Sequence, residues 1–116
     1  MEKTEMIKKE RLLMLQNFAE TYLKMNNMPP SKQLFKDSVD EYGVLNDQQA
    51  AILHLYLEDS YKKMGFDLKK AIEDSGETYV EGKLSKYELD ELIRRADEMI
   101  IFLGVLKLRK EALYNK

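Results

Sequence analysis

Apolar residues recur at steps of three and four along most of this chain, which is the spacing of a helix with one buried face. The helices that this spacing predicts cover residues 4–26, 31–42, 46–64, 67–74 and 85–113. Pro29 and Pro30 end the first helix, because proline lacks the N–H that a helix interior needs. The pattern predicts an all-α fold, a compact bundle of four to five helices with the long first and last helices packed together.

Ser31 is a good N-cap residue for the helix predicted at residues 31–42, and three further predicted helices begin at side chains that can accept hydrogen bonds from their own first turn. Asn46 with Gln49, and Ser85 with Glu88, have the spacing of a capping box, in which each side chain bonds the backbone N–H of the other residue. Asp67 is a good N-cap residue for the short fourth helix. We therefore expect helices to start close to these three positions.

Two glycines, each followed by an apolar residue, predict where helices end. Gly43 before Val44, and Gly65 before Phe66, fit a Schellman ending, in which a left-handed glycine is followed by a residue that packs back on the last turn. For Phe66 the expected contact is Tyr61.

The inward-facing positions follow from the same spacing. They are Leu12, Leu15, Ala19 and Tyr22, then Leu34, Phe35, Val39 and Tyr42, then Ala50, Leu53, Leu57, Tyr61 and Met64, and finally Leu89, Leu92, Ala96, Met99, Leu103 and Leu106. Residues 76–84 contain Gly76, Gly82 and three residues that favour extended backbone, so we expect an irregular loop there.

Residues 99–106 are apolar on every side of the predicted last helix, apart from Gly104. One interpretation is a central helix wrapped by the others. The alternative is that a partner protein or a second copy of the chain covers one side, at Ile101, Phe102 and Val105, because exposed apolar surface is unfavourable in water. Glycine weakens a helix interior by about 1 kcal/mol relative to alanine, so Gly104 suggests a close helix crossing.

Length and composition indicate one folded domain covering residues 1–116. The chain has 44% hydrophobic and 34% charged residues, and its formal net charge is −2. Proteins that hold nucleic acid mainly through its phosphates usually carry a clear basic excess, which is missing here. There is no cysteine, no signal-peptide pattern and no apolar run of the roughly 20 residues that a membrane span needs. We expect a soluble, cytoplasmic protein without a membrane partner.

No residue pattern indicates catalysis. The only histidine is His54, and no set of metal-ligand spacing surrounds it in the sequence. We expect it to be partly buried and hydrogen-bonded locally. The sequence has neither a phosphate-binding glycine loop nor a nucleophile paired with a base. We therefore expect no enzyme activity, no cofactor and no bound metal.

Acidic residues gather near the end of the predicted second helix, at Asp37, Asp40 and Glu41. Negative charge at that end opposes the helix dipole, so these residues gain nothing from the helix itself. They are either a solvated surface or an acidic patch for a basic site on a partner protein.

A second functional hypothesis comes from the turn Asn27-Met28-Pro29-Pro30-Ser31 and the helix predicted after it, which ends at Gly43. The stretch from Phe18 to Gly43 resembles the opening of a LexA-type helix-turn-helix domain. The resemblance implies that the helix after Asn46 reads DNA, with Gln48 and Gln49 near the bases. No basic residue precedes Lys62 in that helix to hold phosphates.

The sequence therefore predicts a small protein-binding module that acts as a regulator, inhibitor or assembly factor. Its partner is expected to be another protein or a second copy of the chain. Lysine outnumbers arginine fifteen to four, a bias common in AT-rich phages and mobile elements, so we expect such an origin. The alternative is a helix-turn-helix transcriptional regulator.

Overall fold

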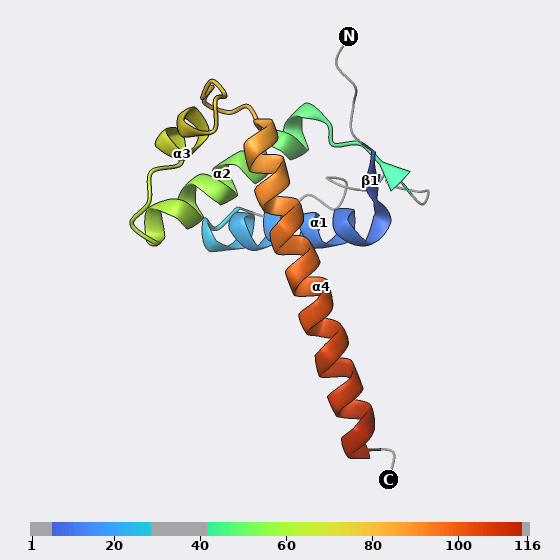
Figure 1. The fold of residues 1–116 in the computed structure, drawn as a ribbon. Helices are drawn as coiled ribbons and strands as arrows, with labels where there is room; N and C mark the ends of the chain where they lie inside the picture. The colour runs from blue at the N-terminus through green and yellow to red at the C-terminus, as the bar shows by residue number, and fades with distance from the viewer. Residues whose placement is uncertain (1–5, 29–41, 115–116) are drawn as a thin grey trace.

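The structure is a computed structural model, and it describes residues 6–28 and 42–114. Within them the helices are α1 (Lys9–Met25), α2 (Asp47–Lys63), α3 (Leu68–Asp74) and α4 (Lys86–Tyr114), and two short strands are β1 (Ile7–Lys8) and β2 (Tyr42–Gly43). Figure 1 shows α4 crossing α1 and then continuing beyond the other helices and strands. The predicted all-α bundle is confirmed.

A two-residue strand pair corrects two predicted helix boundaries. β1 and β2 run antiparallel, with Ile7 opposite Gly43 and Lys8 opposite Tyr42. The first helix therefore begins at Lys9 and not near residue 4, because Ile7 and Lys8 are extended and pair with β2; the Ile7 side chain is buried. Tyr42 and Gly43 lie in a strand, so the helix ending predicted at Gly43 is wrong. The remainder of that predicted helix, residues 31–41, lies outside the described residues.

The predicted helix starts are confirmed at the level of single hydrogen bonds. Asn46 Oδ1 accepts from the Gln49 backbone N–H at 2.8 Å, and Gln49 Oε1 accepts from the Asn46 N–H at 2.8 Å. Asp67 Oδ1 accepts from the backbone N–H of Lys69 at 3.1 Å, which caps α3. These bonds satisfy donors that the first turn of a helix would otherwise leave unpaired.

The ending predicted for α2 is also confirmed. Gly65 has a φ of 81°, the Phe66 N–H donates to the Tyr61 carbonyl at 2.8 Å, and the two rings meet edge to face at 6.4 Å. The same ending recurs after α3, where Gly76 has a φ of 94°, and after α1, where Asn27 takes the left-handed conformation at 57°.

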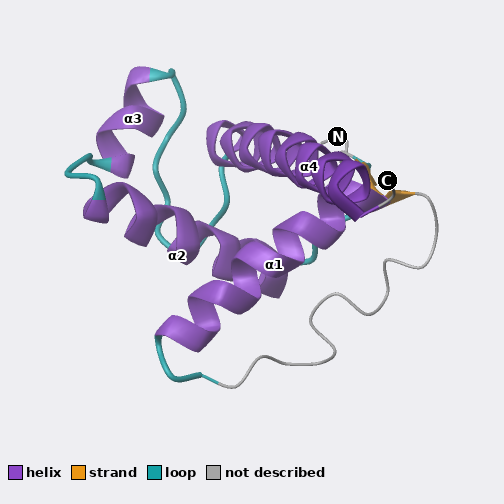
Figure 2. Ribbon diagram, turned by 90° about the horizontal axis from the view of Figure 1, so that it is seen from below, coloured by secondary structure: helices purple, strands orange, loops and turns teal. Residues whose placement is uncertain are grey.

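The core lies where α1 packs against both α2 and α4 (Figure 2). Its largest fully buried apolar side chains are Leu12, Leu15, Leu53, Leu57, Ile72 and Leu92. In α4 the buried residues are Glu88, Leu92 and Ala96, all within the first part of the helix. The expected contact between the long first and last helices is thus present, but only the beginning of α4 takes part in it.

The second part of α4 stands clear of the other elements. Every residue from 101 to 111 is exposed, and this projection contributes to a longest dimension of 54 Å (Figure 1). We call residues 101–111 the distal half of α4.

Candidate functional site

The distal half of α4 carries an unusual amount of exposed apolar surface. Ile101, Phe102 and Val105 are 68%, 57% and 45% exposed, and Leu103, Leu106 and Leu108 are also exposed. The interpretation of residues 99–106 as a central helix wrapped by the others is therefore wrong. Soluble monomers rarely expose a contiguous apolar surface without using it, so this segment is the strongest candidate for a contact surface.

Gly104 makes no close crossing with the other described helices. A Cβ placed on Gly104 would meet nothing within 4 Å, so none of the helices in residues 6–28 and 42–114 uses the space that the missing side chain leaves. The crossing expected from the sequence is not made by the described residues.

An open hollow lies where α4 leaves the body of the protein. It has a volume of about 330 Å³ and is lined by Phe18, Tyr56, Arg95, Glu98, Met99 and Phe102. Its apolar floor includes the parallel stacked rings of Phe18 from α1 and Tyr56 from α2, whose centroids are 5.3 Å apart. Since Met99 and Phe102 line the hollow and also belong to the apolar segment, the two surfaces are continuous.

A bidentate ion pair between Arg11 and Asp97 holds α4 against α1 just before the distal half. The Arg11 Nε and Nη2 atoms donate to the two carboxylate oxygens of Asp97, each at 2.9 Å. A second fixed point is Arg95, which donates to Ser60 Oγ at 2.9 Å and lies 5.7 Å from the centre of the Tyr61 ring. These contacts set the direction in which the distal half leaves the body.

Because both partners of the Arg11–Asp97 pair are half exposed, replacing Asp97 with asparagine is expected to lower the free energy of unfolding by only about 0.5–1 kcal/mol. A double-mutant cycle with Arg11→Gln, followed by urea denaturation, measures the coupling between the two side chains. Arg94→Gln is the control, since Arg94 is exposed and its ion pairs among the described residues are with Glu91 and Glu98 of the same helix. A coupling energy of zero would mean that the pair does not hold α4 in solution.

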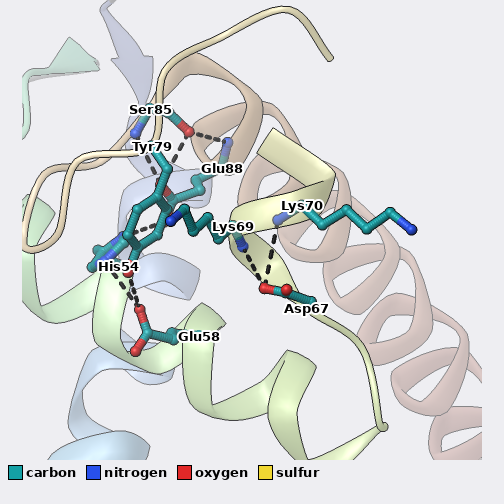
Figure 3. A network of polar contacts seen from close by, with 8 residues as sticks. All are labelled: His54, Glu58, Asp67, Lys69, Lys70, Tyr79, Ser85 and Glu88. Carbon is teal, nitrogen blue, oxygen red and sulfur yellow. Dashed lines mark hydrogen bonds and ion pairs between the residues drawn. The ribbon is translucent and has the colours of Figure 1, made fainter. Parts of the chain in front are cut away.

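A buried pair links α2 to the start of α4 (Figure 3). His54 Nδ1 lies 2.6 Å from Glu88 Oε2, and both side chains are almost completely buried. The other oxygen of Glu88 accepts from the Ser85 backbone N–H at 3.1 Å and from the Ser85 hydroxyl at 3.0 Å, while Ser85 Oγ accepts from the Glu88 N–H. The predicted capping box is thus confirmed, and its glutamate has a second role as the partner of His54.

The other nitrogen of His54 is less well placed. His54 Nε2 lies 3.3 Å from Glu58 Oε2, which is within ion-pair distance, but the described residues give this buried nitrogen no hydrogen bond. Glu58 Oε2 instead accepts from the Tyr79 hydroxyl at 2.6 Å, and this bond, together with burial, raises the pKa of Tyr79. His54 is fully buried and is held mainly by a residue 34 positions away, so the expectation of a partly buried, locally bonded histidine is wrong.

The loop of residues 76–84 is tied to the same helix start. The Glu77 carboxylate accepts from the backbone N–H groups of Lys86 at 3.1 Å and Tyr87 at 2.7 Å. Negative charge at a helix N-terminus is favourable, because it satisfies donors and complements the helix dipole. Within this polar cluster His54 and Glu88 are buried and neither lines the hollow, so the pair is placed to hold α2 against the start of α4.

The residues predicted to read DNA do not share one surface. Gln48 is exposed, whereas Gln49 is buried and its side chain accepts from the Asn46 backbone. The helix-turn-helix interpretation stays a prediction, since most of the helix it needs lies outside the described residues. Asp37, Asp40 and Glu41 also lie outside them, so the proposed acidic patch is not placed.

Among the described residues, no three acidic or histidine side chains are grouped as a metal site. None of the helices in residues 6–28 and 42–114 combines the length and the apolar character that crossing a membrane requires. In comparisons with known proteins, no family model, no curated protein and no solved structure matches this chain.

Proposed function

We propose that this chain is a protein-binding module, a small regulator, inhibitor or assembly factor that acts by contact through the distal half of α4. The observation that carries the proposal is a long helix that leaves the body of the protein with the apolar residues Ile101, Phe102 and Val105 uncovered. The physical reason is the cost of that exposure. Burying apolar surface contributes roughly 25 cal/mol per Å², so a partner that covers several such side chains gains substantial affinity.

The spacing of the exposed residues fits helix recognition. Ile101, Val105 and Leu108 follow each other at steps of four and three, so they lie along one side of α4. Amphipathic helices that dock into a groove on a partner use anchors with this spacing. The Arg11–Asp97 ion pair and the buried side chain of Leu92 hold the base of α4. The helix therefore leaves the body in a defined direction.

The test compares two baits in affinity capture with mass spectrometry. The full chain is immobilised beside a variant carrying Ile101→Asp, Phe102→Asp and Val105→Asp, and circular dichroism checks that both baits keep the same helix content. A Lys107→Glu variant serves as the control, because it changes charge on the same helix without changing an apolar residue.

We expect a protein, which can be the chain itself, to be retained by the native chain and the control and lost with the triple variant. Identical captured proteins from all three baits would contradict the proposal.

A further inference from the structure

We propose that the distal half of α4 pairs with the same segment of a second copy of this chain, in antiparallel orientation, through the face that carries Glu98, Ile101, Phe102, Val105 and Arg109. We call this set the pairing face. The proposal rests on the proposed function and deepens it, since it names the partner that covers the apolar segment.

The pairing face is a single side of the helix. Glu98, Phe102, Val105 and Arg109 follow at steps of four, three and four, which is the spacing of residues along one side of a helix, and Ile101 lies beside Val105. Apart from Glu98, which precedes it, the face belongs to the exposed distal half, and Glu98 is exposed as well. Figure 1 shows no other described element beside this part of α4.

The charged residues on either side of residues 99–106 determine which orientation of the two helices is favourable. Asp97 and Glu98 precede the segment, whereas Lys107, Arg109 and Lys110 follow it. Parallel pairing would set acidic residues beside acidic and basic beside basic, which is unfavourable. Antiparallel pairing about an axis near residues 103 and 104 sets the Glu98 of each copy beside the Arg109 of the other, so the complementary contact forms twice.

The same charge pattern favours a second copy over an unrelated protein. A two-fold interface requires one surface to be complementary to itself, and this surface supplies both the acidic and the basic flank. Glu98 also lies 3.1 Å from Arg94 within its own helix, but both side chains are largely exposed, so Glu98 remains accessible. Asp97 is already engaged by Arg11, which leaves Glu98 as the acidic residue of the face.

The hollow at the base of α4 extends the available surface. Glu98, Met99 and Phe102 belong to its lining, together with the stacked rings of Phe18 and Tyr56. In the antiparallel arrangement the end of the second copy's helix runs toward this hollow, because that helix passes Glu98 in the direction of Arg95. The pair therefore buries apolar surface beyond the helix-to-helix contact itself.

Light scattering on the purified full chain across a range of concentrations tests self-association first. We expect the mass to rise from that of one 13.7 kDa chain to twice that value as concentration increases. A mass of one chain at every concentration would overturn the proposal. The same result is expected if another segment of the same chain covers the pairing face. The proposed function would survive that result if the triple variant still lost a different captured protein.

Charge reversal then tests the orientation. Glu98→Lys and Arg109→Glu should each raise the dissociation constant of the pair at least about tenfold, because each variant places like charges together twice. The double variant should return the dissociation constant to within about threefold of the native value. Lys107→Glu is the matched control. It replaces a basic residue in the same stretch of helix. Lys107 is two positions from Arg109 and therefore lies on nearly the opposite side of the helix, so association should not change.

The alternatives give different patterns. In a parallel pair each single reversal only exchanges one like-charged contact for another, so single variants as strong as the native chain would overturn the antiparallel arrangement. Failure of the double variant to recover would show that Glu98 and Arg109 do not face each other and would also overturn it. Because the substituted side chains are exposed, unchanged circular dichroism is expected for all four variants and separates loss of pairing from loss of folding.

Discussion

Replacing Glu88 with alanine is expected to lower the free energy of unfolding by about 3–5 kcal/mol, the range found when one partner of a buried ion pair is removed. The variant leaves His54 Nδ1 without a partner in a site that excludes water, and it also removes the acceptor for the Ser85 N–H. Both losses act where α2 meets the start of α4. Urea denaturation followed by circular dichroism measures the change.

Glu58→Ala is the matched control, because it removes the other carboxylate beside the same histidine. Glu58 is partly exposed and its bond is made to Tyr79, so the expected loss is about 1 kcal/mol. A cycle that adds His54→Leu separates the pair from the cap, and we expect the two losses to be coupled by about 1–3 kcal/mol. Equal losses of unfolding free energy for Glu88→Ala and Glu58→Ala, or strict additivity in the cycle, would contradict the structural role given to the His54–Glu88 pair.

Helix ends were the most predictable part of this fold, because they depend on side chains within four residues of one another. The capping boxes at Asn46 and Ser85 and the ending at Gly65 are each settled by local hydrogen bonds, and each appears in the structure as expected. The prediction of a helix ending at Gly43 is wrong for a reason that neighbouring residues do not reveal. Tyr42 and Gly43 pair with Lys8 and Ile7, and that pairing depends on how distant parts of the chain are brought together.

The His54–Glu88 pair shows where prediction from the sequence reached its limit. His54 lies four residues after Ala50 and three before Leu57, so its place on the inward stripe of α2 is a signal of burial that the sequence contains. A buried histidine needs a partner, but spacing along the chain does not reveal one that is 34 residues away. Glu88 was also already explained by its capping role, which concealed its second one.

The sequence left two interpretations of residues 99–106 open, core or contact surface, and its apolar spacing does not decide between them. The apolar stripe continues from Leu92 through Ala96, Met99 and Leu103 to Leu106 without a change in spacing, although burial stops after Ala96. Whether a stripe faces its own core or another molecule depends on the lengths of the neighbouring helices. α1 and α2 have 17 residues each whereas α4 has 29, so α4 outruns the body that could cover it.

This difference leads to the second large effect, expected for Leu92→Ala. Leu92 is the large apolar side chain of α4 that is fully buried, so truncating it leaves a cavity at the base of the helix and should cost about 2–5 kcal/mol. Leu106→Ala removes the same atoms from the same stripe two heptads later, where the side chain is exposed, and should cost less than about 1 kcal/mol. Thermal and urea unfolding are compared at a protein concentration low enough to keep the chain monomeric. Similar losses for the two variants would mean that the distal half is packed within a single chain, and the contact surface proposed for it would then not exist.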